Sequence, residues 1–172
     1  MLDPFETLGA PHRFDLDLAQ LEKTHRELSR ALHPDKFVSA GATERRAALE
    51  KAATVNEAWR VVRDPVKRAE ALFRLAGIAV GETNEPKASA MFLMEVMDQR
   101  EALAEARAER DLEKVNALGE AMKSKEKETE ARLSKGFAEG TDVVALVPLL
   151  GELRFYRRFL EEVDAIQEEA ES

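Results

Sequence analysis

His33, Pro34 and Asp35 are the residues whose types and spacing most readily suggest chemistry. A histidine and a carboxylate could form a proton-transfer dyad, but two positions apart around a proline they do not place a base against an orienting carboxylate. No nucleophile or glycine-rich oxyanion loop accompanies them. Local physics offers a simpler interpretation, because His33 suits a helix C-terminus, Pro34 ends the helix and Asp35 starts a turn. The tripeptide is therefore either a stop signal or a contact placed at a helix end.

A metal site is the second chemical alternative, and the sequence disfavours it. The chain has no cysteine and three histidines, which are His12, His25 and His33. The usual multi-histidine or cysteine ligand spacings are absent, and His25 falls on the core side of its predicted helix. The chain also lacks a G-x-x-x-x-G-K-[ST] phosphate loop. We therefore expect no metal, no cofactor and no catalytic residues, so that the protein is not an enzyme.

The elements around the tripeptide are predicted to form a helical hairpin. Leucines at helical spacing indicate one helix that begins after Asp17 and reaches Leu32. A loop should follow from residue 33 to about 42, and a second helix should then run to about residue 63. A basic face lies about 160° around the first helix from its leucine stripe. It consists of Lys23, Arg26 and Arg30. This face points at solvent or at a negatively charged partner.

The whole chain is predicted to be all-α. A short helix starts at "DPFETLG", and Asp64 and Pro65 begin another that Gly77 ends. Residues 77–87, "GIAVGETNEPK", are the best linker candidate. Three more helices should cover about 88–109, 111–137 and 142–169. We expect an N-terminal domain at 1–76 and a C-terminal three-helix bundle at 88–172.

The charge of the chain is unevenly distributed. The formal net charge is −8, of which residues 1–80 carry +1 and residues 81–172 carry −9. The acidic second half would repel phosphates, so we expect no nucleic-acid partner. No stretch approaches the roughly 20 apolar residues of a membrane span, and we see no signal peptide. These features favour a bacterial cytoplasmic protein that does not bind membranes.

The basic helix, "HPDK", the loop and the long antiparallel helix together resemble the J domain of DnaJ-type co-chaperones. In that family the hairpin exposes HPD at its tip, which contacts a DnaK-type chaperone and stimulates its ATP hydrolysis. The resemblance implies that His33, Pro34 and Asp35 make this contact. It gives an electrostatic docking role to Lys23, Arg26, Arg30 and Lys36. The ATPase activity then belongs to the partner.

Further segments narrow the resemblance to HscB-type co-chaperones of iron–sulfur cluster assembly. They are "ATVNEAWRVVRDPVKRAEALFRLAG", "FLMEVMDQREALAEA" and "LRFYRRFLEEV". In that family the C-terminal bundle binds the scaffold protein of IscU type on which the cluster is built, and the co-chaperone delivers it to an HscA-type chaperone. The resemblance implies scaffold binding by Leu93, Met94, Met97, Asp98, Glu101, Glu105 and Phe155. A J-domain co-chaperone for a different client is the alternative.

Helical geometry leaves two interpretations of these residues open. With Phe92 and Leu103 on the core stripe of their helix, Leu93, Met94 and Met97 fall nearly opposite, beside the carboxylates. They either pack on a third helix or form an exposed docking surface. Phe155 lies about 130° from the core stripe of the last helix. It is either at a second helix contact or exposed for binding.

Overall fold

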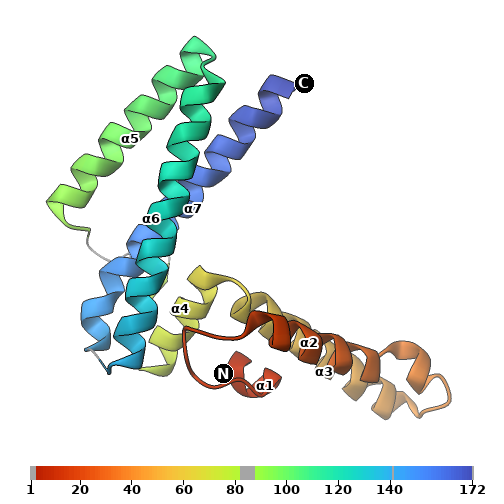
Figure 1. Ribbon diagram of the computed structural model, residues 1–172. Coiled ribbons are helices and arrows are strands. Elements are labelled where there is room, and N and C mark those ends of the chain that lie inside the picture. Colours follow the sequence, from red (N-terminus) through yellow and green to blue (C-terminus); the bar gives the residue numbers. More distant parts are fainter. Residues whose placement is uncertain (1–2, 82–87, 141, 172) are drawn as a thin grey trace. The chain divides into compact units, whose positions relative to one another are not determined.

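The computed structural model describes residues 3–81, 88–140 and 142–171, and every regular element it contains is a helix (Figure 1). The all-α prediction is confirmed. The elements are α1 (Pro4–Leu8), α2 (Leu18–Ala31), the 3-10 turn η1 (Pro34–Phe37), α3 (Ala42–Val62), α4 (Pro65–Leu75), α5 (Ala90–Glu109), α6 (Leu112–Ala138) and α7 (Val143–Glu171). The contacts divide the chain into two units, residues 1–76 and 77–172. Most of the expected linker, residues 82–87, lies outside the described residues.

The N-terminal unit is built around the α2–α3 hairpin. The Asp17 side chain accepts a hydrogen bond from the Gln20 amide at 2.9 Å and so caps α2. Asp64 caps α4 in the same way, with Pro65 in the first turn as predicted. Phe5 of α1, Val62 of α3 and Phe73 of α4 are fully buried and form the base of the hairpin. The apolar core of the unit therefore lies at that base, and the residues at the tip of the hairpin are not needed to form it.

One sequence expectation needs correction at the tip of the hairpin. The segment after His33 was expected to be a loop to about residue 42, but residues 34–37 form a 3-10 turn. Pro34 occupies the first position of that turn, where its missing amide hydrogen is not needed. The proline that ends α2 therefore also starts the next element, and this fixes the direction in which the tip leaves the helix.

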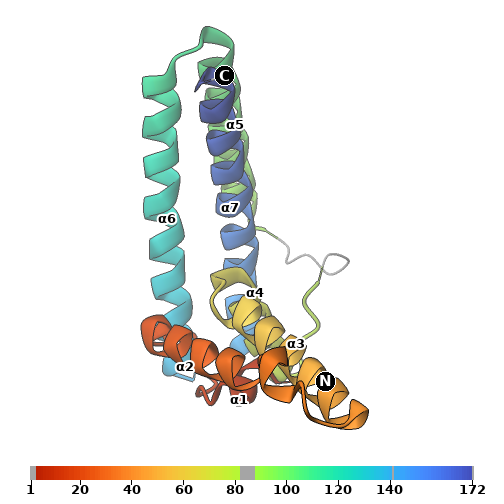
Figure 2. The same cartoon turned by 90° about the vertical axis from the view of Figure 1, so that its right-hand side faces the viewer.

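The C-terminal unit is a bundle of three long helices in contact with one another; in Figure 2, α6 and α7 run side by side and α5 lies partly behind α7. Leu150 and Leu153 of α7 are fully buried, as are Val115 and Leu133 of α6. Gly136 lies where α6 meets α7, and a Cβ atom added there would overlap the Leu146 side chain. Among the described residues, no helix combines the length and apolarity needed to cross a membrane.

Replacing Gly136 by alanine should therefore destabilise the bundle. Overpacking costs about 1–3 kcal/mol, which exceeds the gain of roughly 1 kcal/mol of alanine over glycine in a helix. We expect the free energy of unfolding to fall by about 1 kcal/mol in urea titrations. Gly81→Ala, outside the helices, is the control for a glycine replacement without overpacking, because no atom of a described residue lies within 4 Å of a Cβ added there. An unchanged or higher stability of Gly136→Ala would contradict the close approach of the two helices.

Candidate functional site

The HPD tripeptide is exposed at the end of α2. His33, Pro34 and Asp35 all face solvent, and so does Lys36. The Asp35 amide donates a hydrogen bond to His33 Nδ1 at 3.3 Å, and Asp35 Oδ2 lies 3.4 Å from the same nitrogen. These contacts hold the His33 ring over the first turn of η1 without burying it. The tripeptide thus ends a helix and also presents an ordered, exposed surface. The two interpretations, a stop signal and a binding contact, are therefore compatible.

The basic face predicted on α2 exists and is exposed. Lys23, Arg26 and Arg30 are all open to solvent on that helix. The Arg26 guanidinium forms an ion pair with Glu22 at 2.6 Å, one turn earlier. Such an exposed pair holds its geometry weakly and does not bury the charge. The three side chains lead along α2 toward the exposed tripeptide, so one surface combines both features.

His25 serves the hairpin rather than its outer surface. Its ring stacks on Trp59 of α3, with centroids 5.5 Å apart and planes 17° from parallel. Its Nε2 atom lies 2.9 Å from Asn56 Oδ1, also on α3. The predicted position of His25 on the inner side of the helix is confirmed. These contacts fasten α2 to α3 and so keep the basic face turned outward.

The second candidate surface lies on α5. Leu93, Met94 and Met97 are 51%, 67% and 70% exposed, respectively. Phe92 and Val96 instead pack against the buried cluster of the bundle, and Leu103 is buried within it. The structure therefore selects the exposed alternative for the three apolar residues. The sequence interpretation missed Met91, which is 80% exposed at the start of the same helix.

Acidic side chains flank this apolar patch. Asp98, Glu101 and Glu105 are all exposed on α5. Glu105 lies 3.5 Å from the Lys114 ammonium of α6. Among the described residues, no hydrogen bond or ion pair involves the carboxylate of Asp98 or of Glu101. An exposed Leu/Met surface next to unpaired carboxylates suits a partner that is apolar at its centre and basic at its edge.

Phe155 is not part of an open surface, which corrects its expected direct role in binding. It is 4% exposed, and its ring lies 5.7 Å from that of Phe92 and 5.9 Å from that of Phe159. The reason is that α7 packs against both α6 and α5, so a residue 130° from its main stripe faces a second helix. Arg100 covers the outer side of the ring, with its guanidinium carbon 6.0 Å from the ring centroid. Phe155 can therefore act on the α5 patch through its contacts with Phe92 and Arg100, not as part of the exposed surface.

The fold also brings together three potential metal ligands, of which the sequence analysis considered only His12. Ligand atoms of Asp3, Glu6 and His12 lie within 4.8 Å of one another. His12 Nε2 is 2.6 Å from Asp3 Oδ2, while Asp3 Oδ1 accepts hydrogen bonds from the amides of Phe5 and Glu6. Asp3 is thus the cap of α1, and His12 is its ion-pair partner. Only the chain reversal after α1 brings His12 to this position.

Comparison with known proteins gives consistent matches over both units. A family model described as the HSCB C-terminal oligomerisation domain matches residues 88–164. A co-chaperone protein HscB homologue of Burkholderia multivorans is 33% identical over 168 residues, which cover 98% of this chain and 95% of that protein. A homologue from Neisseria meningitidis is 37% identical over 125 residues, covering 73% of this chain and 75% of that protein.

Solved structures of related proteins share the fold. The chaperone HscB from Vibrio cholerae superimposes with a TM-score of 0.85 at 29% identity, over 98% of this chain and 99% of that one. The human co-chaperone protein HscB gives a TM-score of 0.87 at 26% identity, over 97% and 83% of the two chains.

Proposed function

Since the chain belongs to the HscB family of co-chaperones, we propose that it stimulates the ATPase of a DnaK-type chaperone of HscA type and delivers to it the IscU-type scaffold of iron–sulfur cluster assembly. The observation that carries the proposal is the exposed HPD turn at the end of the basic face of α2. ATP hydrolysis belongs to the partner, and the protein itself contributes two binding surfaces. We place this activity in the bacterial cytoplasm.

The chaperone-binding surface combines steering with a rigid contact. Lys23, Arg26 and Arg30 attract an acidic partner from a distance and orient it. His33 and Asp35 then make the close contact. Pro34 fixes the backbone between them, so little conformational entropy is lost when the turn is bound. Lys36 adds one more positive charge at the end of η1.

The proposed scaffold-binding surface combines apolar area with negative charge, unlike the basic chaperone-binding surface. Leu93, Met94 and Met97 supply apolar area, and methionine side chains adapt to an irregular partner. Asp98, Glu101 and Glu105 supply negative charge at the border of that area. A scaffold whose contact surface has an apolar centre and basic flanks would be bound and oriented at once.

Removing the basic face should raise the co-chaperone concentration needed to stimulate the chaperone. The stimulated ATPase rate at saturation should remain. We expect the combined Lys23→Ala, Arg26→Ala and Arg30→Ala variant to raise the half-maximal concentration for ATPase stimulation about tenfold at low salt. As the salt concentration rises, the half-maximal concentration of the wild type should increase more than that of the variant, because salt screens the charges that the variant lacks. A control that removes the same charge from α6 is Lys123→Ala, Lys127→Ala and Lys135→Ala. Equal behaviour of the two triple variants would contradict docking through α2.

A further inference from the structure

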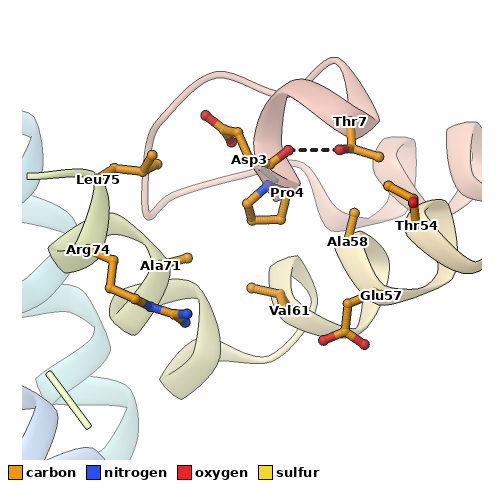
Figure 3. A pocket seen from close by; sticks show the side chains of 10 residues that line it. All are labelled: Asp3, Pro4, Thr7, Thr54, Glu57, Ala58, Val61, Ala71, Arg74 and Leu75. Carbon is orange, nitrogen blue, oxygen red and sulfur yellow. Dashed lines mark hydrogen bonds between the residues drawn. The ribbon is translucent and has the colours of Figure 1, made fainter. Parts of the chain in front are cut away.

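The N-terminal unit contains a pocket that neither proposed surface uses (Figure 3). It lies where α1, α3 and α4 converge and has a volume of about 480 Å³. This falls within the roughly 300–1,000 Å³ of pockets that bind small ligands. Its apolar wall is formed by Pro4, Ala58, Val61, Ala71 and Leu75. None of the residues assigned to the HPD surface lines it, so the pocket is independent of the proposed function.

Most polar groups around the pocket already have partners. The Asp3 carboxylate caps α1 and pairs with His12. The Thr7 hydroxyl donates to the Asp3 carbonyl oxygen at 2.8 Å, and the Thr54 hydroxyl donates to the Glu50 carbonyl oxygen at 2.9 Å. These groups complete the helices themselves. They therefore do not determine which ligand charge the pocket prefers.

Arg74 is one of two lining residues that keep polar atoms without a partner among the described residues. Its Nε atom donates to the Glu70 carbonyl oxygen at 3.3 Å. Its two terminal nitrogens have no hydrogen bond or ion pair with any residue that the structure describes. Figure 3 shows the guanidinium beside the apolar wall, on the side of α4. A guanidinium with both terminal nitrogens available matches a carboxylate, which it can bind through two parallel hydrogen bonds.

Glu57 adds an acceptor on the side of α3. Its Oε2 atom pairs with Arg60 at 2.5 Å. Its Oε1 atom has no partner among the described residues. The pocket thus presents a donor pair for an anion, an apolar wall and an acceptor for an N–H group. A ligand that meets all three has a carboxylate, a hydrocarbon side chain and an amide hydrogen.

We propose that this pocket binds the C-terminal residue of a peptide chain that ends in an apolar amino acid. The terminal carboxylate pairs with Arg74, the side chain lies against Val61 and Ala71, and the last amide N–H donates to Glu57. A fatty acid would satisfy Arg74 and the apolar wall but would leave the acceptor unused. An internal peptide segment would leave Arg74 without an anion.

Titration of the full-length protein with small probes, followed by amide NMR shifts, tests the proposal. N-acetyl-leucine carries all three features, N-acetyl-leucinamide lacks the anion and octanoate lacks the N–H. We expect N-acetyl-leucine to shift the amides of Thr7, Val61 and Leu75 and to bind at least about fivefold more tightly than either other probe. Equal binding of the acid and the amide, or shifts away from the pocket, would overturn the proposal. Tighter binding of octanoate would overturn the peptide assignment in favour of a fatty acid.

Two variants locate the binding determinants. Arg74→Gln should abolish the preference for the acid over the amide, whereas Arg63→Gln, an exposed arginine outside the pocket, should keep it. Val61→Phe should fill the pocket and remove binding of both probes. If Val61→Phe lowers the melting temperature, the test rests on whether Arg74→Gln loses the preference for the acid that Arg63→Gln keeps. An Arg74→Gln protein that still prefers the acid would refute the assignment.

Discussion

Replacing His33 by glutamine should abolish the stimulation of the partner chaperone's ATPase, with a loss of at least about tenfold in the stimulated rate. Truncating a polar group at the centre of a desolvated contact costs roughly 2–5 kcal/mol, and each 1.4 kcal/mol is about a factor of ten. His33 is exposed and its ring accepts only a local hydrogen bond from the Asp35 amide. The fold should therefore survive the change. Steady-state ATP hydrolysis by the chaperone, measured against co-chaperone concentration, gives the result.

The control for this experiment is His12→Gln, a second histidine of the same unit that is also exposed. His12 pairs with Asp3 and does not lie on the proposed contact surface. We expect the His12→Gln variant to stimulate hydrolysis like the wild type. Both variants should keep the circular-dichroism spectrum of the wild type. Full stimulation by a folded His33→Gln variant would refute the assignment of the HPD turn.

Replacing both Leu93 and Met94 by alanine should weaken scaffold binding by about 2–4 kcal/mol, the range of interface hot spots. Both side chains are more than half exposed on α5, so their truncation removes contact area without opening a cavity in the bundle. Isothermal titration calorimetry with the scaffold measures the affinity directly. ATPase stimulation by the variant alone should stay unchanged, because the HPD turn belongs to the other unit.

A matched control removes exposed apolar side chains elsewhere in the same unit. Leu112 and Val144 are 40% and 62% exposed, and neither lies on α5. Leu112→Ala/Val144→Ala should bind the scaffold like the wild type. An unchanged affinity of Leu93→Ala/Met94→Ala, in a normally folded protein, would show that the patch on α5 is not the scaffold surface.

The hairpin could be predicted because its signals are local. Asp17 and Asp64 are capping residues next to apolar helical patterns, and a cap depends on backbone amides within a few residues. The basic face follows from the helical period alone, since Lys23, Arg26 and Arg30 recur on one side. The accessible position of His33 follows from the proline that ends the helix.

The remaining features depend on tertiary packing. The burial of Phe155 could not be predicted, because it depends on α7 having a second neighbouring helix. The periodicity of apolar residues along one helix does not specify how many helices pack against that helix. Met91 lies at the first turn of α5, where exposure depends on where the neighbouring helices end. The contact of His12 with Asp3 depends on a chain reversal outside the helices. Arg74 and Glu57 meet at one pocket only after three helices converge.

The most direct test of delivery measures ATP hydrolysis by the chaperone in the presence of both the co-chaperone and the scaffold. Holding the scaffold on α5 and the chaperone on the HPD turn places both on one chain and raises their effective concentration. Wild-type protein should then give more hydrolysis with scaffold than the sum of the effects of co-chaperone and scaffold added separately. The Leu93→Ala/Met94→Ala variant should show only the sum of the separate effects. The same synergy in that variant and in the wild type would contradict delivery through the α5 surface.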